Sequence, residues 1–407
     1  MSELSYLEKL LDGVEVEWKA VGDIAGYSTT KVDADKLDAT SFVGVDNLLA
    51  DKGGRIDATY QPNTARLTAY EPGDILLGNI RPYLKKVWMA ENNGGCSGDV
   101  LAIRILADCK KIISPEYLYY ALSSDSFFSY SMQHAKGAKM PRGSKDAILN
   151  YQIPIPCPSA PEKSLAIQSE IVRILDKFTA LTAELTDELT AELTLRKKQY
   201  NYYRDKLLSF EEGEVEWKTL GEVAEYSKSR VSFDKLDKNN YVGVDNLLQN
   251  RAGKMQSNYV PTSGNLTEFR EGDILIGNIR PYLKKIWQAD STGGTNGDVL
   301  VIRSCHKSIL PRYLYQILAD DNFFEYNMQH AKGAKMPRGN KDAIMKYRVP
   351  IPSFDEQTRI VTILDKFDTL TNSISEGLPR EIELRQKQYE YYRDLLFSFP
   401  RPETSSN

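Results

Sequence analysis

The sequence has few of the residues and motifs on which most enzyme classes depend. It has four cysteines (Cys96, Cys109, Cys157 and Cys305) without a CxxC pair, and its three histidines are too scattered for a zinc site. It contains no Asn-Pro-Pro-Tyr or Asp-Pro-Pro-Tyr string, which an adenine methyltransferase would carry, and no GxxxxGKS or GxxxxGKT loop for a translocase. We therefore expect neither a metal site nor a catalytic centre in this chain.

Long apolar runs are also absent, and the opening MSELSYLEKLLDG is no signal peptide, so we expect a cytoplasmic protein without a membrane span. The formal net charge of −4 argues against a uniformly basic nucleic-acid binder. The charges are unevenly distributed, however. Residues 170–194 hold six acids and two bases, whereas residues 132–146 hold four bases and one acid. The second segment is therefore suited to phosphate despite the overall charge.

One long passage is present in two copies. Residues 43–49 (VGVDNLL) return as 242–248, residues 78–86 (GNIRPYLKK) as 277–285, and residues 132–143 (MQHAKGAKMPRG) as 328–339 without a change. The period is much longer than that of a solenoid, so it indicates duplication of a whole domain. A chain of 407 residues is long enough for two such domains with proper cores. Two near-identical binding surfaces suit a target that itself has two similar halves.

Each copy ends in a segment with helical periodicity, which in the first copy predicts a helix from about residue 165 to 208. Gly377 and Pro379 predict a break in the second helix. Neither helix can bury its apolar stripe alone, so we expect the two to pair in antiparallel orientation. The apolar positions expected at the helix surfaces that pack are Ile171, Leu175, Phe178, Leu185, Ile360, Leu364, Phe367 and Ile374.

Between these helices, the sequence predicts domains that mix short strands and helices. GDILLGNI and DVLAIRI are β-prone, PEYLYYALSSDSFFSYSMQ has helical spacing, and YQIPIP is an extended exit segment. The start of the chain, Lys9-Leu10-Leu11 before VEVEWK, matches Lys206-Leu207-Leu208 before EVEWK. The chain therefore begins with the end of the closing helix, as a cyclic repeat of domain and helix requires.

The expected fold is α+β, with two similar α/β domains separated by two long antiparallel helices; the family resemblance given below implies that these are target-recognition domains. These helices form a coiled-coil spacer, and the whole is a pseudo-two-fold cyclic repeat. The expected parts are a helical segment at 1–13, a first domain at 14–157, a spacer helix at 165–210, a second domain at 213–352, a second spacer helix at 354–399 and a polar tail at 400–407.

The first candidate site is the GNIRPYLKK run. It places one arginine and two lysines beside a tyrosine: Arg81, Tyr83, Lys85 and Lys86 in the first copy, and Arg280, Tyr282, Lys284 and Lys285 in the second. Basic groups with an aromatic ring suit phosphate contact, and an arginine can hydrogen-bond guanine in the major groove. The alternative is a turn that braces the domain, with lysines that are merely solvated. For the tyrosines we favour that structural interpretation.

The second candidate site is the KGAKMPRGSK run, in which glycines allow the backbone to approach a ligand closely. It carries four cations in each copy: Lys136, Lys139, Arg142 and Lys145, and then Lys332, Lys335, Arg338 and Lys341. Each contact to phosphate would add to the salt dependence of binding. The alternative is a surface loop that is simply basic. His134 and His330 are equivalent, but a lone histidine beside a helix end is more often a satisfied polar residue than a ligand.

The EWK strings, Glu17-Trp18-Lys19 and Glu216-Trp217-Lys218, match part of a nuclease motif. Matches of three residues are common by chance. A tryptophan between the charged residues also suggests a packed strand, so we favour a structural role.

Taken in order, these motifs resemble the specificity subunit of type I restriction-modification systems. The resemblance rests on the order domain, helix, domain, helix, on EWK and NIRPYLKK in each domain, and on KGAKMPRGSKDAI followed by IPIP. ILDKF and RKKQYNYYRDKLLSF in the helical segments complete it. It implies that each domain reads one half of an interrupted DNA site, while the helices set the gap and dock two methyltransferase subunits.

The resemblance implies double-stranded DNA as a partner, and restriction or translocase subunits where the system has them. S-adenosylmethionine and ATP with magnesium would bind those partner subunits, so we expect no cofactor on this chain. Because the readers are near-copies, we expect a palindromic or nearly palindromic gapped target. Differences such as Asp51–Gly54 against Asn250–Gly253, or Cys96-Ser97 against Thr295-Asn296, are where that symmetry would relax, since one base contact is worth roughly 1–3 kcal/mol.

Two other hypotheses remain open from the sequence. The chain would be a stand-alone bivalent DNA-binding regulator if it worked without enzyme partners, with the long helices acting only as a spacer. It would be a protein-only scaffold if it showed no salt-dependent DNA binding.

Overall fold

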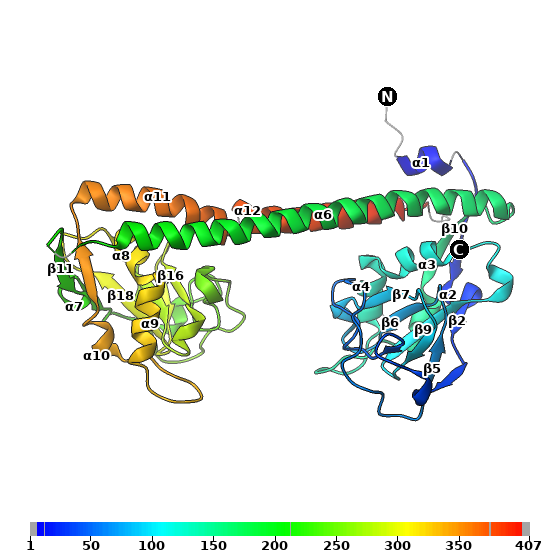
Figure 1. Ribbon diagram of the computed structural model, residues 1–407, viewed down its shortest axis with the longest axis horizontal. Coiled ribbons are helices and arrows are strands. Elements are labelled where there is room, and N and C mark those ends of the chain that lie inside the picture. Colours follow the sequence, from blue (N-terminus) through cyan, green and yellow to red (C-terminus); the bar gives the residue numbers. More distant parts are fainter. Residues whose placement is uncertain (1–5, 12, 212, 374–375, 401–407) are drawn as a thin grey trace. The chain divides into compact units, whose positions relative to one another are not determined.

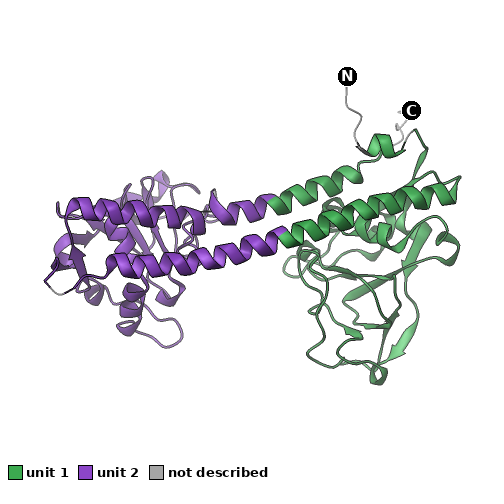
Figure 2. Cartoon of the chain, turned by 45° about the horizontal axis from the view of Figure 1, so that its top comes forward, with its two compact units in different colours: residues 1–184, 385–407 green, residues 185–384 purple. Residues whose placement is uncertain are grey.

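The structure is a computed structural model that describes residues 6–11, 13–211, 213–373 and 376–400. The chain divides into two compact units, residues 1–184 with 385–407 (unit 1) and residues 185–384 (unit 2), coloured separately in Figure 2. Each unit contains one copy of the duplicated domain and parts of the long helices. Ile374 and the polar tail beyond residue 400 lie outside the described residues.

The long helices differ in continuity. Helix α6 spans Pro161–Leu208 and begins before the expected residue 165, because a proline fits the first turn of a helix. The second segment is divided into α11 (Phe354–Asn372) and α12 (Gly377–Leu396), which matches the expected break. Gly377 has a φ of +79°, and a Cβ atom there would lie 2.5 Å from the Thr369 carbonyl oxygen. Glycine therefore permits the turn between α11 and α12.

In unit 1, the first part of α6 lies beside the last part of α12 in antiparallel orientation (Figures 1 and 2). The rings of Phe178 and Tyr392 stack with centroids 5.3 Å apart. Ile171 and Leu175 are fully buried against the domain. The short helix α1 (Tyr6–Leu11) adds Leu7 and Leu11 to the same core, to which α12 contributes Leu396. Helix α1 thus packs into the same core as α12.

In unit 2, the second part of α6 lies beside α11. Phe367 stacks on Tyr200 and Tyr203, with centroids 5.8 and 5.6 Å apart. Ile360 and Leu364 are fully buried in the core of this unit, whereas Leu185 is half-buried.

The domain of unit 1 is built on short, mostly antiparallel strands. One sheet has the order β2 (Ala25–Tyr27), β9 (Val100–Ile105), β6 (Ile75–Gly78), β7 (Val87–Met89). Another has the order β3 (Lys31–Asp33), β5 (Arg66–Tyr70), β8 (Gly94–Cys96), β4 (Phe42–Val43), with β4 parallel to β8. The EWK segment forms β1 (Val16–Ala20), which pairs with the exit strand β10 (Gln152–Pro156). The runs predicted as β-prone are therefore strands β6 and β9.

The domain of unit 2 repeats this arrangement. Its four-stranded sheet has the order β12 (Ala224–Tyr226), β18 (Val299–Ser304), β15 (Ile274–Gly277), β16 (Ile286–Gln288). A further sheet has the order β13 (Arg230–Ser232), β14 (Asn265–Phe269), β17 (Gly293–Thr295), and a parallel bridge from Tyr241 to Gly294 takes the place of β4. Strand β11 (Glu216–Thr219) pairs with β19 (Arg348–Ile351).

Short helices complete both domains. In unit 1 they are α2 (Val21–Ile24), α3 (Pro115–Leu122), α4 (Asp125–Gln133) and α5 (Lys145–Asn150), and in unit 2 they are α7 (Leu220–Val223), α8 (Pro311–Leu318), α9 (Asp321–Gln329) and α10 (Lys341–Ile344). The run PEYLYYALSSDSFFSYSMQ thus forms two helices. The hydroxyl of Ser124 accepts a hydrogen bond from the Phe127 amide, which caps α4 and separates it from α3.

The central strands are buried on both faces, which explains their continuous apolar runs. Ile75 and Leu77 of β6 belong to the main core, whereas Leu76 packs with Trp88 on the other face. The structure confirms the expected α+β class with two similar domains and long antiparallel helices. Within the described ranges, no helix combines the length and apolar character that a bilayer crossing requires.

Candidate DNA interface

The GNIRPYLKK run forms a tight turn after the central strand of each domain. A 3-10 turn at Pro82–Leu84 lies between Arg81 and Lys85, which both adopt left-handed backbone conformations with φ of 53° and 51°. Arg280 and Lys284 repeat these values at 52° and 49°. Such conformations are unfavourable for residues with a Cβ atom and are found mostly where the surrounding structure imposes them. Both copies therefore hold this turn in one strained geometry.

The arginine and the tyrosine of this turn face solvent in both copies. Arg81 and Arg280 are exposed, and the side chains of Tyr83 and Tyr282 are each 49% exposed. The structural role that we favoured for these rings from the sequence stays a prediction, since a half-exposed ring can pack on the turn and also meet a ligand. All four side chains are free to meet a ligand.

The lysines of the same turn lie against acceptors within the domain. Lys86 donates to the carbonyl oxygen of Val45 at 2.7 Å, and Lys285 donates to that of Val244 at the same distance. Lys85 donates to the Asp125 carboxylate at 2.9 Å. In the second copy Lys284 donates to Asp321 at 2.6 Å. These four lysines brace the turn, although their charge still contributes to the local field.

The KGAKMPRG run forms a hairpin. The backbones of Lys136 and Arg142 exchange two hydrogen bonds of 2.9 Å, and Gly137 at the turn has a φ of 98°. Lys332, Arg338 and Gly333 repeat this geometry, with a φ of 101° at the glycine. The lysines of both hairpins are exposed: Lys136, Lys139, Lys332 and Lys335.

Arg142 and Arg338 pair with acids at the base of the hairpin, Asp99 and Asp298 respectively, while more than half of each arginine side chain stays exposed. The remaining two cations begin the helix that follows the hairpin. Lys145 lies over the Tyr27 ring at 5.7 Å, and Lys341 lies over the Tyr226 ring at 6.0 Å.

The hairpin and the turn form one structural unit. The amide of Arg81 donates to the Pro141 carbonyl oxygen at 2.7 Å, and the amide of Gly143 donates to the Asn79 carbonyl oxygen at 3.0 Å. Because Arg280 and Pro337 repeat the first bond at 2.7 Å, both domains present the same assembly. We call the turn at 80–86 and the hairpin at 134–143, with their second copies at 279–285 and 330–339, the recognition edge.

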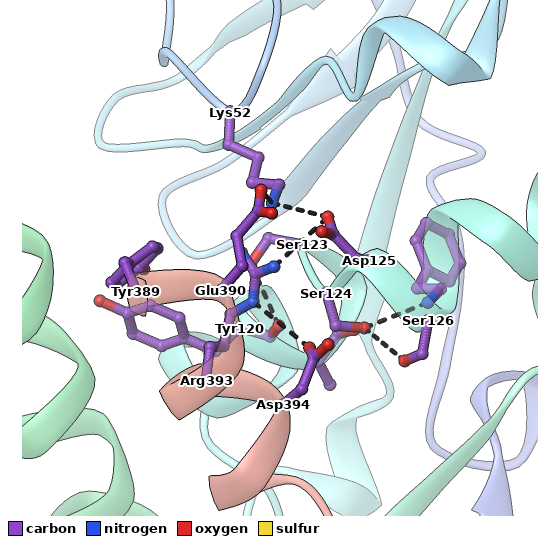
Figure 3. Close-up of polar contacts among 12 residues, drawn as sticks. Lys52, Tyr120, Ser123, Ser124, Asp125, Ser126, Tyr389, Glu390, Arg393 and Asp394 are labelled. Carbon is purple, nitrogen blue, oxygen red and sulfur yellow. Dashed lines mark hydrogen bonds and ion pairs between the residues drawn. The ribbon is translucent and has the colours of Figure 1, made fainter. Parts of the chain in front are cut away.

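A cluster of charges that we did not predict from the sequence joins Lys52 and Asp125 of the unit 1 domain to α12 (Figure 3). Because Lys85 of the recognition edge pairs with the same Asp125, the cluster also anchors that edge. Lys52, whose side chain is 12% exposed, lies 2.8 Å from Asp125 and 3.4 Å from Glu390. Arg393 of α12 is 1% exposed and lies 3.3 Å from the same carboxylate oxygen of Asp125. The sequence does hold one signal for this cluster, because a cation occupies the position of Lys52 in both copies (Arg251) while the residues around it change.

The charges in this cluster shift one another's pKa. Burial alone would raise the pKa of Asp125, but hydrogen bonds from Lys52 and Lys85 and the charge of Arg393 outweigh it and hold that pKa below its ordinary value. Burial, and then the charge of Arg393, lowers the pKa of Lys52. Asp125 is therefore ionised at neutral pH and serves as the shared partner of three cations.

Unit 2 builds the same junction with a different distribution of acids. Arg251 and Lys284 pair with Asp321, and the buried Arg204 of α6 donates to the Ala319 carbonyl oxygen at 3.3 Å. In α6, Asn201 occupies the position that Glu390 occupies in α12. The second acid of the unit 2 junction is instead Asp320, the residue after Ala319 in the domain. Burial raises the pKa of Asp320.

The EWK strings have a structural explanation. Lys19 pairs with Glu17 at 3.0 Å along strand β1, and Lys218 pairs with Glu216 at 3.5 Å in β11. The Trp18 indole donates to the Pro400 carbonyl oxygen at 3.0 Å, so the tryptophan belongs to the fold. Among the residues that the structure describes, no cluster of three or more acids, histidines and cysteines could hold a metal ion.

Comparison with known proteins identifies the family. A family model of the type I restriction modification DNA specificity domain matches residues 72–195 and 212–384. A type I restriction enzyme specificity subunit of Escherichia coli is 39% identical over 100% of both chains. A putative type I restriction enzyme specificity subunit of Haemophilus influenzae is 32% identical, over 97% of this chain and 98% of its own.

A solved structure from a study of complex assembly and conformational transition in the type I restriction-modification system shares the fold. It covers 94% of this chain and 97% of its own, with a TM-score of 0.61 at 18% identity. The residues that the family model matches include the recognition edge of both domains. The chain therefore belongs to the family of type I restriction-modification specificity subunits, which are the non-catalytic DNA-recognition subunits of these complexes.

Proposed function

We propose that this chain directs an adenine-N6 methyltransferase complex to a gapped, nearly palindromic DNA site, and that the recognition edge of each domain contacts one half-site. The observation that carries this proposal is the repetition of the edge. Both copies have the same hairpin sequence, the same bonds between hairpin and turn, and the same exposed arginine, tyrosine and lysines. Two equal surfaces read equal half-sites if they meet the duplex in inverted orientation.

The positions of the differences between the copies support near-palindromy. Lys52 and Arg251 differ, but both are held in ion pairs within their own unit. Cys96 and Thr295 differ, and both are buried. Exposed differences include Asp51 against Asn250, and many lie in the loop at 55–65 and its copy at 254–264. In that loop, besides some conservative changes, only the tyrosine and the proline are retained. This loop is where the two half-sites would diverge.

In this proposal two methyltransferase subunits are the protein partners, with a restriction or translocase subunit where the system has one. S-adenosylmethionine and ATP with magnesium bind those subunits, and the complex works in the cytoplasm. Family membership favours this function over a stand-alone regulator or a protein-only scaffold.

The test is modified-base sequencing of genomic DNA from cells that express this chain with its methyltransferase, against cells that lack only this chain. A gapped palindromic N6-methyladenine motif that disappears without the chain supports the whole proposal. A gapped motif with unlike halves retains the function and contradicts the symmetry. If assembly is confirmed and no motif depends on the chain, the proposed function is wrong.

A further inference from the structure

The hairpin of each recognition edge carries one exposed apolar side chain among its cations. Met140 is 51% exposed and its counterpart Met336 is 49% exposed. Each methionine precedes a proline that is buried, Pro141 or Pro337. A proline restricts the residue before it to extended conformations, so the buried ring limits how the methionine backbone can turn. The methionine is therefore presented to solvent from a well-fixed backbone.

Single exposed apolar residues are common on protein surfaces and need no explanation by themselves. The comparison between the two copies is what distinguishes these methionines. In the exposed loop at 55–65, Ile56 has become Met255 and most neighbouring positions have also changed. In the hairpin, none of the residues from 132 to 143 differs from its counterpart. Exposure by itself therefore does not keep residues identical between the two copies of the domain. The exposed residues of the hairpin, in contrast, are identical in both copies.

The surroundings of each methionine indicate a polyanionic partner. The segment 132–143 contains no acid, and the exposed lysines of the first hairpin, Lys136 and Lys139, lie on either side of Gly137. A two-stranded ribbon is of a size that the major groove of B-DNA admits, and the apolar group on base edges in that groove is the thymine methyl. Lysines that reach phosphates would bring Met140, the residue directly after Lys139, close to the bases.

We infer that Met140 and Met336 are specificity-determining residues, each of which packs on a thymine methyl group at the same position of its half-site. The inference rests on the proposed function. It adds to that function an uncharged side chain in each domain that reads a base, and it names thymine as that base. The lysines beside it supply affinity without sequence preference.

The test selects duplexes from a library randomised in its central segment, using the chain assembled with its methyltransferase. We expect the wild-type complex to enrich a gapped motif. Met140→Ala should lose the preference at one A·T pair in one half only, and Met336→Ala should lose it at the same position of the other half. For the duplex enriched by the wild type, each variant should bind about tenfold more weakly, as expected for much of a buried methionine contact.

The salt dependence of binding separates this contact from an electrostatic one. Met140→Ala should leave the slope of log affinity against log salt unchanged. The matched variant Lys139→Ala should keep the motif and reduce the slope by about one. Because both side chains are exposed, all variants should retain the wild-type melting temperature.

Variants that enrich the wild-type motif with full preference at every position would overturn the inference while leaving the proposed function intact. Loss of preference confined to G·C pairs would also overturn it. If the assembled wild-type complex itself enriches no gapped motif, then the proposed function fails and the inference fails with it.

Discussion

The ammonium group of Lys85 lies 2.9 Å from the carboxylate of Asp125, the first residue of α4. This pair fastens the turn that follows strand β6 to the helix behind it. The same carboxylate receives Lys52 from a neighbouring turn and Arg393 from α12. One acidic side chain therefore connects the recognition edge of unit 1 to its long helix.

Replacing Asp125 with asparagine should destabilise unit 1, because three cations lose their shared ionised partner. The Asp125 side chain is 25% exposed, so we expect a loss of about 1–3 kcal/mol, below the cost of breaking a fully buried pair. Hydrogen exchange measured by mass spectrometry should show faster exchange at 51–52, at 81–85 and in the last part of α12. The matched variant Asp321→Asn should move the effect to unit 2. Unchanged protection in both variants would refute the role of these carboxylates.

The same cluster should make stability depend on pH in a defined direction. The folded pKa of Asp125 is depressed, so its contribution is complete above the unfolded pKa of about 4 and is lost as pH falls through that value toward the folded pKa. The difference in unfolding free energy between wild type and Asp125→Asn should therefore be largest at neutral pH. It should shrink as pH falls below about 5. A difference that stays constant from neutral to acidic pH would argue against the shifted carboxylate.

Substitution at the base of the hairpin should cost more in unit 2 than in unit 1. A Cβ atom on Gly143 would lie 2.8 Å from the side-chain oxygen of Asn79, whereas on Gly339 it would lie 2.7 Å from Asn278 and 2.5 Å from Asn327. We expect a loss of about 1–3 kcal/mol for Gly339→Ala and a smaller loss for Gly143→Ala, both measured by chemical denaturation.

Gly98→Ala is the control for this pair, since a Cβ atom there would meet nothing within 4 Å. Equal losses at Gly143 and Gly339 would show that the asparagine beneath the second hairpin, which is a serine in the first copy, does not constrain it.

Substitution of Arg81 by glycine should maintain or raise stability while it weakens DNA binding. Its left-handed backbone is unfavourable for any residue with a Cβ atom, by roughly 1–2 kcal/mol. Arg81→Gly should therefore be at least as stable as wild type, while Arg81→Ala gains nothing. Both variants should bind DNA more weakly, which titration against the methylated motif would measure. An Arg81→Gly variant that binds as wild type does would remove Arg81 from the interface.

Several features of the fold follow from local sequence. The spacing of Ile171, Leu175 and Phe178 predicted a long helix because helical periodicity is a property of neighbouring residues. The break at Gly377 was predictable because glycine and a nearby proline, Pro379, disfavour a continuous helix whatever the tertiary structure. The capping of α4 by Ser124 was missed, since the apolar spacing of the segment continues through the cap.

The duplication, the hairpin shared by both copies and the charge of every candidate side chain were determined by the sequence itself. Which cations stay available to a ligand was decided by tertiary structure. Lys85 and Lys139 are both lysines in basic motifs, yet Lys85 meets a carboxylate 40 positions along the chain whereas Lys139 stays at an exposed tip. The partner of a long side chain depends on which distant segment the fold brings within hydrogen-bonding distance. A local pattern of residues does not contain that information.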